Sequence, residues 1–103
     1  MKIYVTENDI RIASDSRNDN NKEYRANRDC PIAQSFRRRG HHNVKVEGTD
    51  FTSISPTGMR KIYYLPDVAQ EFIRDFDREQ IVLPFRFTAT LSAYPGQYQT
   101  YKN

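Results

Sequence analysis

The chain has 103 residues, of which 37% are hydrophobic, 13% aromatic and 28% charged, and its formal net charge is +3. This length allows one domain with one core, and the composition excludes a membrane-spanning or wholly disordered chain. The single cysteine excludes an intramolecular disulfide, and no apolar run of signal-peptide length opens the sequence, so we expect a cytoplasmic protein.

The first quarter of the chain predicts a strand, a helix and a long polar loop. Apolar and polar side chains alternate over residues 2–5, as in a half-buried strand. Thr6 is followed by acidic residues, which favours a short helix over about residues 7–13. Residues 14–28 contain one aromatic and no aliphatic side chain larger than alanine. Too little apolar area is present there to offset the entropy of ordering, so we expect a mobile loop.

The segment 29–40 predicts a second helix. Asp29 is a good N-cap, and Pro31 is tolerated in a first helical turn. An apolar stripe follows, formed by Ile32, Ala33 and Phe36. Three arginines then occupy the last turn, where cations favour the negative end of the macrodipole, and Gly40 fits the left-handed position beyond it.

The rest of the sequence predicts three strands, a third helix and a last strand. Residues 44–65 read as a three-stranded meander, residues 67–76 as an amphipathic helix and residues 83–91 as a strand with one buried face. The fold class is therefore α+β, a small and mainly antiparallel sheet with two or three helices packed on it, in the order β-α-α-β-β-β-α-β. We expect one domain over residues 1–91 and a tyrosine-rich tail over residues 92–103.

Three local signatures occur together: KIYVT at the start, DCPIAQSFRRRG followed by VKV, and YYLP…EFIRDFD with LPFRF. In this combination the chain resembles a family of short tailed-bacteriophage proteins whose members have no established activity. The resemblance covers most of residues 1–91, outside the polar loop, and implies a phage source and no mechanism. The loop 14–28 and the tail 92–103 depart from the compact form of the family, and they are where a partner of this chain's own is expected.

Catalytic candidates are few. Cys30 sits at a predicted helix start, where a thiol becomes more acidic, and His41 and His42 follow the same helix. The two ends of that helix are roughly 15 Å apart, so the imidazoles do not reach the sulfur locally. We interpret Cys30 as a small buried thiol, and the spacing of these residues predicts no zinc site and no cofactor. Between residues 67 and 79, five acids against two arginines predict a solvated acidic face.

The sharpest binding candidate is the basic segment at the end of the second helix. Three consecutive arginines span about 300° of a helix, so at least two of them face water. They either contact phosphates or serve dipole compensation and solubility alone. Tyrosines of the tail have no core role and are common interface anchors. The predicted partner-binding or nucleic-acid-binding residues are Arg25, Arg28, Arg37, Arg38, Arg39, Lys45, Tyr94, Tyr98 and Tyr101.

Two functions follow from these features. The first is a non-enzymatic phage accessory protein that binds a host protein or ribonucleoprotein complex, for instance as an inhibitor of a host defence system of the anti-CRISPR kind. The alternative is a nucleic-acid-binding protein that uses Arg37–Arg39 and Lys45. The sequence leaves the target and the oligomeric state open.

Overall fold

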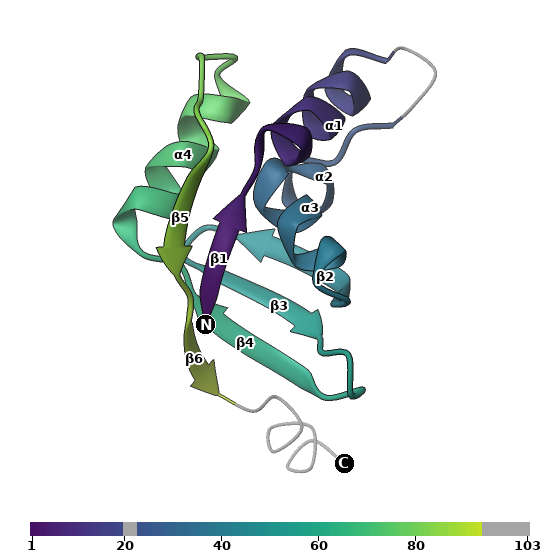
Figure 1. Ribbon diagram of the computed structural model, residues 1–103, viewed down its shortest axis with the longest axis vertical. Coiled ribbons are helices and arrows are strands. Elements are labelled where there is room, and N and C mark those ends of the chain that lie inside the picture. The colour runs from purple at the N-terminus through teal and green to yellow at the C-terminus, as the bar shows by residue number, and fades with distance from the viewer. Residues whose placement is uncertain (20–22, 94–103) are drawn as a thin grey trace.

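A computed structural model describes residues 1–19 and 23–93 of the chain (Figure 1). Residue 93 is described by its backbone alone. The predicted α+β class and the order of its elements are confirmed, with one additional short helix and a division of the last strand. The elements are β1 (Lys2–Val5), α1 (Glu7–Asn18), α2 (Ala26–Asp29), α3 (Pro31–Arg38), β2 (His42–Glu47), β3 (Asp50–Ile54), β4 (Arg60–Tyr64), α4 (Asp67–Asp77), β5 (Phe85–Thr88) and β6 (Thr90–Ala93).

The strands form two antiparallel sheets. β1 pairs with β5, and the other four strands pair in the order β2-β3-β4-β6. Figure 1 shows the strands of the two-stranded sheet running across those of the larger one, with α1 and α3 beside β1 and α4 beside β5. The predicted meander therefore corresponds to β2–β4.

The predicted strand 83–91 is divided at Ala89, where the chain changes partner. Ala89 is fully buried, its N–H donates to the Met1 carbonyl at 2.8 Å, and its carbonyl accepts from the Met1 nitrogen at 2.9 Å. β5, before it, pairs with β1, whereas β6, after it, pairs with β4. The buried face of the strand ends there, because Leu91 is exposed.

Two rows of aromatic rings join the helices to the sheets. Phe36 of α3 stacks on Phe51 of β3 with ring centroids 3.4 Å apart, and Phe51 stacks on Tyr63 of β4 at 5.1 Å. On the other side, Phe72 of α4 stacks on Phe85 of β5 at 4.5 Å. Rings bury large areas, so these rows supply much of the packing in a chain with few aliphatic residues.

The prediction of a mobile loop over residues 14–28 is wrong at both of its ends. α1 continues to Asn18, and α2 begins at Ala26. Arg17 explains the longer helix, because its guanidinium lies 4.2 Å from the Phe76 ring centroid and donates to the Phe76 carbonyl. The loop was predicted because the segment lacks large aliphatic side chains, but the long cationic side chain of Arg17 supplies the packing contact instead. Residues 20–22 of this segment lie outside the described residues.

The ends of α3 partly match the prediction. Pro31 opens the helix, and Gly40 has the expected positive φ of 93° beyond its end. Asp29, however, is not the N-cap. It ends α2, and its carboxylate accepts from the Arg25 N–H at 2.8 Å, while Cys30 takes the N-cap position without a side-chain hydrogen bond.

A buried carboxylate, Asp9, ties α1 to the rest of the fold. Thr6 and Asp9 form a capping box, in which the Asp9 N–H donates to Thr6 Oγ1 and the Thr6 N–H donates to Asp9 Oδ2. The Arg38 guanidinium at the end of α3 donates to both Asp9 oxygens, at 3.3 and 3.2 Å, and to the Tyr4 carbonyl at 2.8 Å. This arrangement joins α1, α3 and β1 through one ion pair.

Within the described residues, none of the helices combines the length and the apolar character that crossing a bilayer requires.

Replacement of Asp9 by alanine is expected to lower the free energy of unfolding by about 2 kcal/mol, since it removes the carboxylate half of the capping box and both bonds from Arg38. Urea unfolding followed by circular dichroism measures the change. Asp15→Ala on the exposed side of the same helix is the control and should change stability by less than about 0.5 kcal/mol. Equal stabilities of the two variants would contradict the role given to Asp9.

Candidate functional site

The three consecutive arginines do not form one surface. Arg38 is held by Asp9, Arg37 donates to the backbone carbonyl of Arg28, and Arg39 is exposed beyond the end of α3. Successive helical residues are about 100° apart, so their side chains leave α3 in different directions. The predicted patch is therefore distributed over several faces, and Arg38 has a structural partner.

Two members of the predicted patch do meet in a groove on the four-stranded sheet, which we call the basic groove. Its volume is about 460 Å³, and its cations come from three elements, Arg28 of α2, Lys45 of β2 and Arg60 of β4. The remaining lining residues are polar or aliphatic: Asn43, Thr52, Ser53, Ile54 and Ile62. Among the described residues no acidic side chain lines the groove, although Lys45 Nζ lies 2.7 Å from Glu47 Oε1 in an exposed pair. Such a pair costs little to open.

Sequence reasoning missed Arg60 as a member of the basic groove. The register of the sheet places it there, because Ile54 lies opposite Arg60, and Thr52 lies between Lys45 and Ile62. Pro56, Thr57 and Gly58 are a usable signal in the sequence, since such turn residues place the first residue of the following strand beside the end of the preceding one.

Asn43 occupies an unusual backbone position in the basic groove. Its φ is 51°, and the pairing of β2 with β3 shifts register between His42 and Lys45. Asparagine tolerates this left-handed region better than most residues, and a bulge redirects the side chains next to it. The bulge therefore shapes the rim of the groove.

Arg25 and the tail tyrosines are not part of this groove. Arg25 is exposed before α2 and is joined to Asp29 through its backbone N–H. The predicted contacts Tyr94, Tyr98 and Tyr101 lie outside the described residues.

Cys30 and His41 are both buried and serve the packing of α3. Burial raises the pKa of the Cys30 thiol to about 11, so it stays protonated near neutral pH. Burial, with the charge of Arg39 next in importance, lowers the pKa of His41 below 6.5. The Nδ1 atom of His41 lies 2.9 Å from Ser53 Oγ. The predicted buried thiol is confirmed, and within the described residues no three His, Cys, Asp or Glu side chains are grouped to hold a metal ion.

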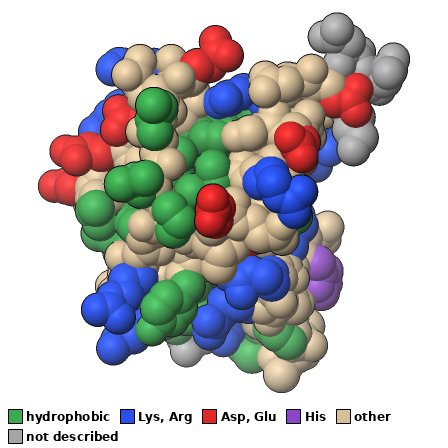
Figure 2. All heavy atoms as spheres, turned by 45° about the horizontal axis from the view of Figure 1, so that its top comes forward, with side chains coloured by type: hydrophobic (Ala, Val, Ile, Leu, Met, Phe, Trp, Pro, Cys, Tyr) green, Lys and Arg blue, Asp and Glu red, His purple; other side chains and the backbone are tan. Residues whose placement is uncertain are grey.

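A second surface, which sequence reasoning missed, lies where α4 is connected to β5. Ile81 and Leu83 are 93% and 74% exposed, and Val68 of α4 is also exposed. Figure 2 shows hydrophobic side chains gathered on one face, with acidic side chains on one side and Lys and Arg below. We call the connection of residues 81–84 the apolar segment. The sequence predicts Leu83 on the buried face of a strand that begins at residue 83, so the exposure of Leu83 differs from the prediction.

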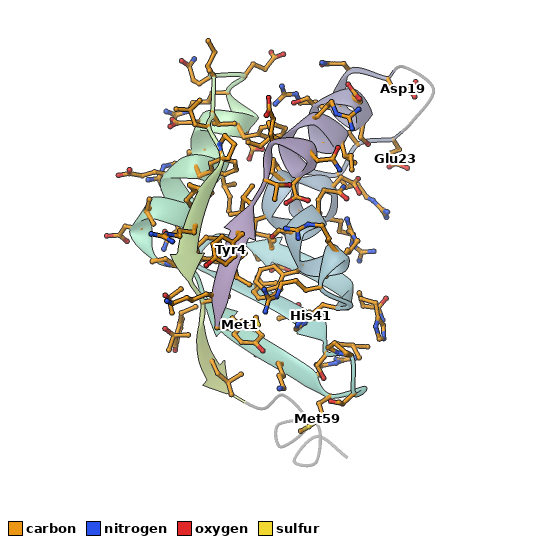
Figure 3. The ribbon with its side chains drawn as sticks, in the orientation of Figure 1. Met1, Tyr4, Asp19, Glu23, His41 and Met59 are labelled. Atoms are coloured by element: carbon orange, nitrogen blue, oxygen red, sulfur yellow. The ribbon has the colours of Figure 1, made fainter. Side chains whose placement is uncertain are left out.

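Next to the apolar segment lies a shallow, mainly apolar hollow of about 410 Å³. It is bounded by Tyr4 of β1 and by Pro84 and Phe85 at the start of β5. Figure 3 shows the Tyr4 side chain over these two strands, and the register agrees, since Tyr4 lies opposite Arg86. The hollow and the apolar segment thus form one continuous surface around the start of β5.

No protein-family model, no curated protein and no solved structure matches this chain. Its function is therefore inferred from the chemistry of the basic groove and of the apolar segment, because a fold alone does not define a function.

The reactivity of Cys30 tests whether its thiol is buried, as the structure shows, or accessible, as thiol catalysis would require. In the native protein at about pH 8, Cys30 should react with Ellman's reagent at least about a hundredfold more slowly than in guanidinium chloride, because burial raises its pKa from 9.0 to about 11 and blocks access. The release of thionitrobenzoate is followed spectrophotometrically in both solvents. A native rate that equals the unfolded rate would contradict the buried position.

Proposed function

We propose that this protein is a non-enzymatic accessory protein of a tailed bacteriophage that acts in the cytoplasm of the infected host. In this proposal it binds a host protein, alone or in a ribonucleoprotein complex, as an inhibitor of a host defence system of the anti-CRISPR kind. The sequence resemblance supports the source. The exposed apolar segment supports the mode of action.

The observation that carries the proposal is the exposure of Ile81 and Leu83, at 93% and 74%. Side chains of this size lose about 1.5–3 kcal/mol of favourable transfer free energy when left in water. Grouped apolar side chains next to a hollow, with charged residues around them, are typical of protein interfaces. A partner that covers the apolar segment would recover this free energy.

The test is capture from host lysate. The tagged protein, treated with nuclease, should retain a host protein that is identified by mass spectrometry, and Ile81→Asp with Leu83→Asp should release it, because charges replace the apolar contacts. Met59→Asp is the matched control, since Met59 is exposed in the turn before β4. Retention of the same protein by the double variant, or no specific capture, would refute the proposed mode of binding.

A second candidate function is nucleic-acid binding through the basic groove. The observation that favours it is the convergence of Arg28, Lys45 and Arg60 around a groove whose described lining residues include no acid. Guanidinium and ammonium groups in this arrangement can contact the phosphates of a single strand.

Salt dependence tests this candidate. Anisotropy of a labelled oligo(dT) or oligo(U) strand should show an affinity that falls about twentyfold between about 50 and 200 mM salt if three phosphates are contacted. Arg28→Glu with Arg60→Glu should abolish binding, whereas Arg78→Glu, an exposed arginine at the end of α4, should leave it nearly unchanged. No binding at the lower salt concentration would eliminate this function.

A further inference from the structure

Within residues 1–19 and 23–93, the outer edge of β5 carries backbone groups without a neighbouring strand. In the two-stranded sheet, β1 is the one neighbour of β5. Met1 and Ala89 form a hydrogen-bonded pair, and antiparallel pairs alternate, so Ile3 with Phe87 and Val5 with Phe85 are hydrogen-bonded pairs too. It follows that the N–H and C=O groups of Arg86 and Thr88 point away from β1.

The contact between Arg38 and Tyr4 confirms this alternation at the opposite edge of the two-stranded sheet, the outer edge of β1. Tyr4 lies opposite Arg86, and its carbonyl accepts from Arg38 on the side away from β5. The Tyr4 carbonyl at the outer edge of β1 is thus covered by a guanidinium group. The corresponding edge of β5 has no such cover among the described residues.

The surroundings of this edge suit an added strand. A hollow of about 260 Å³ is lined by Lys2 and by Arg86, Phe87 and Thr88 of β5. Arg86 and Thr88 are both exposed, and the apolar segment leads directly into β5. The edge of β2 differs, because β2 carries a bulge and Lys45, both of which discourage pairing.

The charges define what the added strand would carry. Lys2, Tyr4, Arg86 and Thr88 occupy the exposed face of the two-stranded sheet, and neither Lys2 nor Arg86 has an acidic partner among the described residues. The opposite face is apolar, with Phe87 buried there and Val68 exposed on neighbouring α4. An extended peptide that alternates acidic and apolar side chains matches both faces, since side chains of a strand alternate with period two.

We propose that the edge of β5 captures an extended, acidic segment of the partner protein by antiparallel strand addition, with acidic side chains beside Arg86 and apolar side chains towards α4 and the apolar segment. This rests on the proposed function as a protein-binding accessory protein, and names the partner's chemistry. Backbone hydrogen bonds to Arg86 and Thr88 would supply affinity, and the alternating side chains would supply specificity.

A second copy of the chain is a poorer occupant. Pairing of two β5 edges would bring both Arg86 and both Lys2 side chains to one face, and each copy carries a net charge of +3. Like charges across paired strands are destabilising, so the charge that attracts an acidic peptide disfavours self-association.

The test uses the labelled peptide amide Val-Glu-Val-Glu-Val-Glu-Val and measures its binding by fluorescence anisotropy. Binding should weaken about tenfold or more with Arg86→Glu, which reverses the charge, and with Thr88→Pro, which removes one outward N–H. The peptide with lysine in place of glutamate should not bind. Arg78→Glu is the charge-matched control and should bind like the native protein.

Modified peptides keep the test independent of any variant that fails to fold. In an antiparallel pair the glutamate directly opposite Arg86 shares its hydrogen bonds, so N-methylation of the glutamates should abolish binding, whereas N-methylation of the valines should not. If the peptide N-methylated at its glutamates and the peptide N-methylated at its valines both bind, strand addition is overturned. It is also overturned if the unmodified peptide does not bind at about 1 mM. Self-association of the protein that is lost with Thr88→Pro would assign the edge to a second copy and overturn the proposal.

The two proposals fail separately. Peptide binding without any captured host protein would refute the proposed function and leave the edge as a peptide site. Capture that depends on Ile81 and Leu83 but persists with Thr88→Pro and Arg86→Glu would refute strand addition and leave the proposed function standing.

Discussion

The reciprocal hydrogen bonds between Met1 and Ala89 are the constraint on which the arrangement of the sheets depends. They hold the start of β1 against the point where β5 passes into β6, so that one stretch of chain serves two sheets. The stretch leaves β1 for β4 at this point, and among the described residues no other strand lies along the outer edge of β5. The same junction thus encloses Ala89 and is followed by the pairing of β6 with β4.

Most of the elements could be predicted from local signals. The amphipathic pattern of α4, the proline and glycine that bound α3, and the alternation in β1 all survive in the structure. The errors have a common cause in contacts between distant residues. Arg17 extends α1 by packing on Phe76, and the division at Ala89 depends on Met1, 88 residues away, so no window of sequence contains either signal.

The candidate surfaces were less accessible to sequence reasoning than the fold. Charge alone identified Arg28 and Lys45, but only the register of β3 with β4 adds Arg60, and only the position of Asp9 removes Arg38 from the binding residues. Ile81 and Leu83 are exposed, although the Ile-Val-Leu-Pro segment has the composition of a buried strand. Exposure is a property of the whole fold, and composition therefore misleads at such positions.

The acidic outer face of α4 and the cations of the basic groove have a consequence for association kinetics. The exposed acids Glu71 and Asp75 lie on α4, whereas the cations of the basic groove come from α2, β2 and β4, so opposite charges occupy different parts of the surface. An incoming charged molecule is rotated by the field of these charges before any atoms touch, which raises the fraction of productive encounters. The rate of association would then respond to ionic strength far more than the lifetime of the complex, whichever surface finally makes the contact.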